Sequence, residues 1–332
     1  MSRWIVLIVC LTACSTAPPP SATSCLATAP TAPPLALDRP RRLIFQTGFE
    51  ANTQILRREA AFDKITGKDL SVPEKGDWDA DLVGHPNIGG TRIFYSDGDA
   101  TQRKTTLVAD PDSPANKVME FRLIKANELH VIGASKGRIQ LGISNNTQLR
   151  GLSYSVRIRL REGFDALSQY SGKISWMTLA EFWNNESNKA YPFRITLNLN
   201  KKKGANKPLF WGAHGQDKDD DGNWRDRWRV EVDDAPVPLD QWLTLSVSLA
   251  EGCKPHGWFR VVLTTANGAK HTLVDRRDLM QHPKDPRPNG VNAFNPMKLY
   301  TSKEFVDFVR DRGKNLVVLW DDFKLYDRAT TQ

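Results

Sequence analysis

The stretch "YSVRIRLR", residues 154–161, decides the fold class, because apolar and polar side chains alternate along it residue by residue. Successive side chains of an extended chain point to opposite faces, so one face here is apolar and the other carries a serine and three arginines. The apolar face holds Tyr154, Val156, Ile158 and Leu160. This period of two is typical of a half-buried antiparallel strand.

The same alternation recurs along the chain. It is clearest in "FRITLNLN" at 193–200 and "WLTLSVSL" at 242–249, and further strands are predicted at 118–124, 258–263 and 315–326. Turns rich in Gly, Pro, Asn and Asp separate these segments, and little helix lies between them. We therefore predict an all-β domain, a sandwich of two antiparallel sheets.

One short helix is predicted near the C-terminus, in "TSKEFVDFVRDRG" at 301–313. Thr301 would cap its N-terminus, and Glu304, three residues later, would complete a capping box. Gly313 would end the helix. Its apolar face should pack across one end of the sandwich.

The first residues predict export. Arg3 precedes a short apolar run, and Leu11-Thr12-Ala13-Cys14 matches the lipobox of bacterial lipoproteins, in which the cysteine is acylated after cleavage. We expect a signal peptide at 1–13, a Pro/Ala/Thr-rich tether at 14–42 and one folded domain at 43–328. The alternative is an ordinary secretory signal. Ser15, and not Asp, follows the cysteine, and in lipoprotein sorting this favours delivery to the outer membrane of the cell envelope. The protein would then lie on the periplasmic or the surface face of that membrane.

Four cysteines are too few for a disulfide framework, since two lie in the signal and at the lipidation site. A bridge from Cys25 to Cys253 is possible, but we expect the tether cysteine to be free. The net charge of +8 suits an anionic partner, although it serves solubility equally well. The chain has no phosphate-binding Gly-rich loop, paired Cys/His motif or Gly-x-Ser-x-Gly, which disfavours nucleic-acid partners, organic cofactors and serine hydrolysis.

A carboxylate stands inside the apolar segment "WMTLAEFWNN" at 176–185. Alternation puts Glu181 and Trp183 on one face, and since neither face is polar, the strand should be central, with one face under a groove. We predict that Glu181, Trp183, Arg194 and Asn198 bind sugar there. Alternatively, Glu181 is structural and pairs with Arg194.

Other polar residues leave alternatives open. The arginines of 154–161 are expected mostly on an outer face, and His130 and His214 are candidate proton carriers. In "DKDDDGNWRD" at 217–226, Asp217, Asp219 and Asp221 have the spacing of a calcium loop. Position 12 is Trp228 and not Glu, so this segment is either a calcium site or an acidic surface turn.

The order of segments resembles the concanavalin A-like jelly-roll superfamily. It runs from "GFE" at 48–50 and "GRIQLGI" at 137–143 to "PMKLY" at 296–300 and "WDDFKLY" at 320–326. It is most similar to polysaccharide lyases of the heparin lyase I, glucuronan lyase and alginate lyase type. The resemblance implies cleavage of uronic-acid chains by β-elimination. One group neutralises the carboxylate, a base takes the C5 proton, and an acid protonates the leaving oxygen.

Site residues follow from the resemblance only in part. Where it implies Gln-x-His, this chain has Glu181-Phe182-Trp183, in which Glu181 does not easily neutralise a substrate carboxylate and Trp183 cannot act as a proton-transfer base. Lys298 and Tyr300 are retained and would be the catalytic pair, with the tyrosine as base, acid or both. The resemblance also implies a structural Ca²⁺ between Glu50 and Asp322; the alternative is that Asp322 only caps the end of its strand.

Three functions are therefore compared. The first is an exported lipoprotein that cleaves anionic polysaccharide, the second a non-catalytic carbohydrate-binding lipoprotein, and the third a structural envelope lipoprotein. We expect a monomer that meets polysaccharide in its groove and the membrane through lipid at Cys14. Glycoside hydrolysis is disfavoured because no second carboxylate accompanies Glu181 on its strand.

Overall fold

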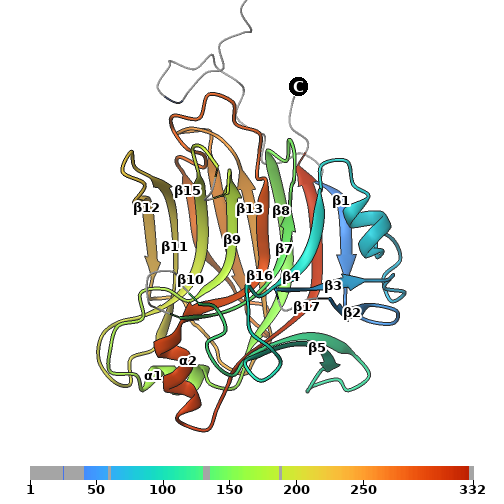
Figure 1. Ribbon diagram of the computed structural model, residues 1–332, viewed down its shortest axis with the longest axis vertical. Helices are drawn as coiled ribbons and strands as arrows, with labels where there is room; N and C mark the ends of the chain where they lie inside the picture. Colours follow the sequence, from blue (N-terminus) through green and yellow to red (C-terminus); the bar gives the residue numbers. More distant parts are fainter. Residues whose placement is uncertain (1–24, 26–40, 59–60, 130–134, 187–188, 329–332) are drawn as a thin grey trace, which may run out of the picture.

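The alternating segments form two antiparallel β-sheets that lie face to face (Figure 1). The computed structural model describes residues 25, 41–58, 61–129, 135–186 and 189–328. One sheet, called sheet A, runs in the order β15-β14-β13-β8-β17-β6-β5, with β1 also paired to β17. The other, sheet B, runs in the order β12-β11-β10-β9-β16-β7-β4-β3-β2. The predicted two-sheet sandwich is confirmed.

The strands of sheet A are β1 (Arg41–Thr47), β5 (Arg103–Ala109), β6 (Lys117–Leu123), β8 (Gly151–Leu160), β13 (Leu243–Ala250), β14 (Trp258–Thr264), β15 (Lys270–Arg277) and β17 (Leu316–Arg328). The strands of sheet B are β2 (Gln54–Arg57), β3 (Phe62–Thr66), β4 (Gly90–Phe94), β7 (Lys136–Ser144), β9 (Thr178–Asn184), β10 (Phe193–Lys201), β11 (Leu209–Lys218), β12 (Trp224–Val232) and β16 (Ala293–Ser302).

The hydrophobic core lies between the sheets, on the faces that the alternation predicts. The apolar members of β8 and β10 are buried, namely Tyr154, Val156, Ile158, Leu160, Phe193, Ile195, Leu197 and Leu199. Phe182 of β9 packs in the same layer and stacks on Phe294 of β16 at 6.3 Å between ring centroids. Because Phe182 points into the core, its neighbours Glu181 and Trp183 point to the opposite face of sheet B.

The arginines of β8 lie on the face of sheet A that points away from the core. Arg157 donates to Asp321 at 2.9 Å, and its guanidinium lies 4.4 Å from the Trp242 ring. Arg159 pairs with Asp112 and Asp240. These partners hold the arginines on the outside of the sandwich, as predicted.

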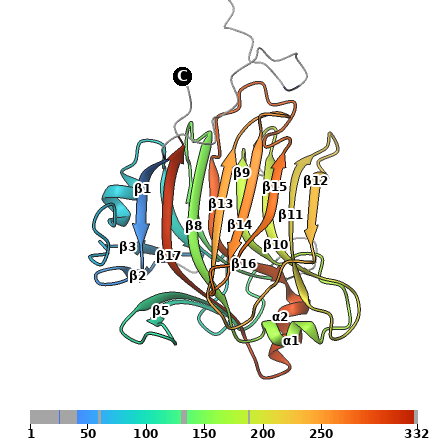
Figure 2. The same cartoon turned by 180° about the vertical axis from the view of Figure 1, so that it is seen from behind.

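Three short helical segments occur in the described residues, not one: η1 (Trp78–Val83), α1 (Phe164–Ser168) and α2 (Lys303–Arg310). The helix α2 packs with α1 at one end of the sandwich (Figure 2). The prediction of a capping box is wrong. Thr301 still belongs to β16, where it pairs with Gly137, and Ser302 is the N-cap of α2. Pairing within the sheet outweighs the local helix signal. Glu304 instead accepts a hydrogen bond from the Tyr170 hydroxyl.

The expectation that Cys25 is free is wrong, since it forms a disulfide with Cys253. The backbone N–H of Cys25 also donates to the carbonyl of Pro283, at 3.1 Å. The predicted signal peptide, the lipidation site Cys14 and most of the tether lie outside the described residues. Among the helices that the structure describes, none is both long and apolar enough to cross a membrane.

Candidate functional site

The outer face of sheet B carries a groove of about 650 Å³. It lies over the central strand β9, which pairs with β10 on one side and β16 on the other, as the apolar character of its two faces predicts. The lining residues come from β4, β7, β9, β10, β11, β12 and β16 and include Arg92, Phe94, Lys136, Arg138, Gln140, Glu181, Trp183, Arg194, Trp224, Asn295, Lys298 and Tyr300.

A buried ion pair forms the floor of the groove. The Lys298 amine donates to Glu181, and their side chains are 2% and 8% exposed. Burial favours the neutral form of Glu181, but the positive charges of Lys298 and Arg194 outweigh it, so the pKa of Glu181 lies below its ordinary value. Burial lowers the pKa of Lys298 to about 8, against the attraction of Glu181.

Two arginines flank this pair with their positive charges. Arg194 of β10 donates through Nε to Gln216 at 2.7 Å, and its guanidinium lies 4.1 Å from the Trp224 ring. Burial lowers the pKa of Arg194 from its ordinary value. Arg138 of β7 lies 4.3 Å from the Tyr300 ring and pairs through Nε with Glu128, outside the groove lining, at 2.9 Å. The groove is therefore positive around one buried carboxylate, as an anion-binding site requires.

Tyr300 stands next to Lys298 on the groove face of β16. Its ring lies 4.9 Å from the Lys298 amine and 5.0 Å from the Trp176 ring. Within the described part of the chain, its hydroxyl has no hydrogen-bond partner. Tyr300 is thus half-buried in the groove, and a bound ligand can reach its hydroxyl.

The structure brings five of the predicted residues into this groove: Glu181, Trp183, Arg194, Lys298 and Tyr300. It does not bring Asn198 there. The Asn198 side chain is buried, accepting a hydrogen bond from Thr178 and donating to Thr196. His214 is half-buried and does not line the groove, and partial burial lowers its pKa to about 4, which keeps the imidazole neutral. His130 lies outside the described residues.

Several groove residues were missed from the sequence. Arg92 lines the groove from β4, Arg138 and Gln140 line it from β7, and Asn295 does so from β16. The alternation of "GRIQLGI" does put Arg138 and Gln140 on one face. The position of β7 beside β16 brings them to Lys298, and this pairing joins segments about 160 residues apart, as in the pair Lys298 and Gln140.

The calcium loop at 217–226 is not supported by the position of Asp217. Its carboxylate is fully buried and accepts hydrogen bonds from Arg225 at 2.8 Å and Arg227 at 2.7 Å, so two arginines already balance its charge. Asp219 accepts from the backbone N–H groups of Asp221 and Asn223, as in an ordinary turn.

The second calcium prediction concerns Glu50 and Asp322. Burial raises the pKa of Glu50, and the charges of Asp69 and Asp322 act in the same direction, so these carboxylates lie near one another. One Glu50 oxygen accepts from the Lys117 backbone N–H at 2.9 Å. No cluster of three or more His, Cys, Asp or Glu among the described residues has metal-binding geometry. Calcium at Glu50 and Asp322 stays a prediction.

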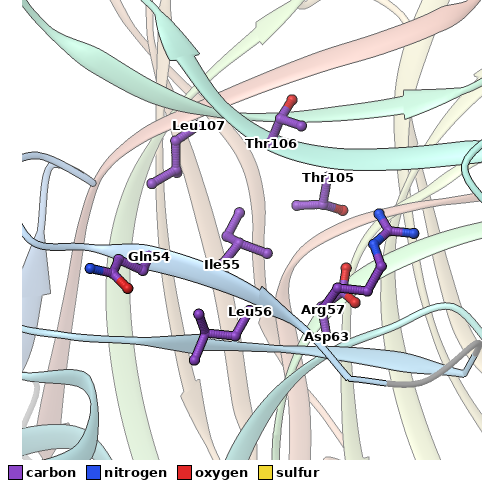
Figure 3. A pocket seen from close by; sticks show the side chains of 8 residues that line it. All are labelled: Gln54, Ile55, Leu56, Arg57, Asp63, Thr105, Thr106 and Leu107. Carbon is purple, nitrogen blue, oxygen red and sulfur yellow. The ribbon is translucent and has the colours of Figure 1, made fainter.

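A second hollow, of about 490 Å³, lies between the edge strands β2 and β5 (Figure 3). Ile55 and Leu107 point toward each other from these strands. At its polar end, Asp63 accepts from the Tyr95 hydroxyl at 2.6 Å. None of the sequence-predicted site residues lines this hollow, and fewer charged groups converge on it. The groove of sheet B is the candidate site.

Comparisons with known proteins agree with the architecture. The structure is similar to an endo-β-1,4-glucuronan lyase from the fungus Trichoderma reesei, with 12% identity over 70% of this chain and 94% of that one, at a TM-score of 0.41. It is similar to an alginate lyase from Aplysia kurodai, with 9% identity over 75% and 94%, at 0.45.

It is also similar to the exolytic alginate lyase AlyA5 from Zobellia galactanivorans, with 9% identity over 77% of this chain and 99% of that one, at a TM-score of 0.45. Neither the protein-family models nor the curated proteins gave a match. The chain is thus similar in fold to jelly-roll polysaccharide lyases. The sequence identity is too low to assign a role to any residue of this chain.

Proposed function

We propose that this protein binds an anionic, uronic-acid polysaccharide in the groove of sheet B and cleaves it by β-elimination. The observation that carries the proposal is the convergence of Arg194 and Arg138 on Lys298 and Tyr300 in one groove. Arg194 can bind a carboxylate, Arg138, which is paired with Glu128, adds positive charge, and the lysine and tyrosine carry protons. These are the roles that the reaction needs.

In this reaction Arg194 pairs with the uronate carboxylate, which withdraws electrons and makes the C5–H more acidic. The step starts from the Tyr300 phenolate, formed when its hydroxyl loses its proton to solvent, and this phenolate oxygen takes the C5 proton. The C5–H electrons form the C4–C5 double bond, the bond from C4 to the glycosidic oxygen breaks, and that oxygen takes a proton from Tyr300. Lys298, held by Glu181, keeps its positive charge beside the reacting carbons.

The second candidate is carbohydrate binding without turnover. It is favoured by the engagement of the Lys298 amine with Glu181, because a lysine held in a buried ion pair is less available for proton transfer. The groove would then hold the polymer through its cations and through Trp183, whose indole can stack on a sugar.

The test is the ultraviolet absorbance of the unsaturated uronate product during incubation with alginate, glucuronan or glycosaminoglycans. We expect absorbance to rise with one of them and Tyr300→Phe to slow it by about a hundredfold to ten-thousandfold, the usual contribution of general acid–base catalysis. Tyr326→Phe, in sheet A, is the control. Binding without product would leave the non-catalytic function, and absence of both would refute the proposal.

We also propose that the chain is an exported lipoprotein of the bacterial envelope, anchored through Cys14. The lipobox supports this, and the disulfide between Cys25 and Cys253 suits an oxidising compartment outside the cytosol. Growth with a clickable palmitate analogue should label the wild type and not Cys14→Ser. Equal labelling of both, or of neither, would contradict the lipid anchor.

A further inference from the structure

We infer that Gln216 is a positioning residue: it holds Arg194 so that the two terminal amino groups of the guanidinium face the groove and take a sugar carboxylate. This inference rests on the proposed function and names the substrate group that this part of the groove recognises. It also separates Gln216, which touches no substrate, from Arg194, which does.

Sheet pairing places the two side chains together. Arg194 of β10 stands directly opposite Gln216 of β11, so both project on the groove face. The Arg194 Nε–H donates to the Gln216 oxygen at 2.7 Å, and the Gln216 amide nitrogen donates to Asp226 at 2.6 Å. An ionised carboxylate accepts hydrogen bonds only, and a guanidinium donates only. The Gln216 amide is therefore fixed in one orientation.

Aromatic rings restrict Arg194 further. Its guanidinium carbon lies 4.1 Å from the Trp224 ring centre and 5.8 Å from that of Trp183, and the two indoles meet edge to face at 5.6 Å. With Nε bound to Gln216 and a face covered by Trp224, the remaining open edge carries the two terminal nitrogens. Within the part of the chain that the structure describes, these nitrogens have no acceptor.

The open edge of the guanidinium fits a carboxylate. Two parallel N–H groups of arginine match the two oxygens of a carboxylate, which makes the contact directional as well as ionic. Glu181, the carboxylate whose charge acts most strongly on Arg194, is already paired with Lys298. The guanidinium thus keeps its positive charge for a ligand.

A neutral residue at position 216 is what preserves this charge. The carboxylate of Asp226 contacts Gln216, and its other oxygen lies 3.6 Å from Arg229, so it supports Arg194 without pairing with it. A glutamate at 216 would accept the same Nε–H but would neutralise Arg194. Gln216 therefore orients the cation and leaves it attractive to anions.

The first arm of the test is independent of any ligand. Arginine side-chain ¹⁵Nε–Hε spectra, with the Arg194 signal assigned from Arg194→Lys, would follow hydrogen exchange with water. We expect a slowly exchanging Hε in the wild type, and rapid exchange in Gln216→Met with an unchanged fold by circular dichroism. Gln54→Met, on β2, should leave the signal unchanged. Slow exchange that persists in Gln216→Met would overturn the positioning role.

The second arm measures binding of uronate oligosaccharides and their carboxyl-reduced counterparts by calorimetry. We expect Gln216→Met and Gln216→Glu to weaken uronate binding by about tenfold to a hundredfold, the range for a hydrogen bond to a charged group, and to leave the reduced sugars unaffected. In an Arg194→Met background, Gln216→Met should have no further effect.

The two arms separate the possible failures. Equal losses for uronate and reduced sugars, or additive effects with Arg194→Met, would overturn the carboxylate assignment. A wild-type protein that binds no uronate would refute the proposed function and the carboxylate assignment together. The exchange measurement would still decide whether Gln216 positions Arg194.

Discussion

Removing the carboxylate of Glu181 tests whether the ion pair in the groove is as deeply buried as the structure indicates. Lys298 has one opposite charge beside it, Glu181, and two like charges, Arg138 and Arg194. In Glu181→Gln the lysine ammonium is buried among cations with no counter-charge. Breaking one side of a buried pair costs about 3–5 kcal/mol.

The cost of Glu181→Gln has an upper limit, because Lys298 can lose its proton and become neutral rather than stay charged and unpaired. Its ordinary pKa is 10.5, and each pKa unit corresponds to about 1.4 kcal/mol, so deprotonation at pH 7 costs about 5 kcal/mol. In the wild type the folded pKa of Lys298 is lowered to about 8, and Glu181→Gln lowers it further. Consider a pH between the lower pKa of Lys298 in the folded variant and its pKa of about 8 in the folded wild type. In this range the unfolded chain holds the lysine proton and the folded variant does not, so the variant gains stability as pH rises. The folded wild type still holds the proton, so its stability does not change. The penalty should therefore shrink toward pH 8 by about 1.4 kcal/mol per pH unit.

The assay is urea unfolding followed by tryptophan fluorescence at pH 6, 7 and 8. Lys303→Met, which breaks an exposed pair with Asp307, is the control and should cost less than about 1 kcal/mol. Glu181→Gln combined with Lys298→Met should recover most of the lost stability, because no charge is then left unpaired. A penalty below about 1 kcal/mol, or one that grows with pH, would refute this description of the groove floor.

Four further predictions concern residues outside the groove. Burial raises the pKa of Glu251 to about 6, so its charge costs stability above pH 6, and Glu251→Gln should add about 2 kcal/mol to the free energy of unfolding at pH 8 but little at pH 4. A loss at pH 8 would contradict this. Lys201→Met should cost about 3 kcal/mol, because the three N–H groups of the lysine are surrounded by four backbone carbonyls within hydrogen-bond distance, and an unchanged urea midpoint would disprove it. Cys253→Ser should lower the stability of the oxidised protein by about 2–4 kcal/mol and leave that of the reduced protein nearly unchanged. If Glu50 and Asp322 hold calcium, a chelator will lower the melting temperature of the wild type and not that of Glu50→Gln; no shift in either would count against it.

The sequence predicted those features that depend on local patterns. Alternation identified the buried faces of β8 and β10 and the central position of the Glu181 strand. Each buried face of a strand carries apolar side chains at every second position, so its burial can be predicted from the strand's own sequence. It misplaced the start of α2, since Thr301 satisfies a capping pattern but is held in the sheet by Gly137. Local signals cannot include a competing partner that is distant in sequence.

The same limit explains what was missed in the groove. Glu181 and Lys298 are 117 residues apart, and their contact depends on β16 lying beside β9. Arg92 and Arg138 join them only because β4 and β7 continue the sheet beyond β16. A basic strand residue looks the same whether it lies over a groove or on an outer face, so the order of strands had to be known first.

If Cys14 carries a lipid anchor, the disulfide between Cys25 and Cys253 limits the distance between the domain and the membrane. If Cys14 carries the lipid, eleven residues rather than the whole tether set the reach, which is about 40 Å for a fully extended chain. Cys253 follows β13 at the end of the sandwich opposite to α1, since Ala250 pairs with Gly151 and α1 comes after the other end of β8. The bridge would then attach the tether to the domain at a defined end of the sandwich. The groove would then bind polysaccharide close to the membrane, and α1 and α2 would lie at the end of the sandwich that is farther from the membrane.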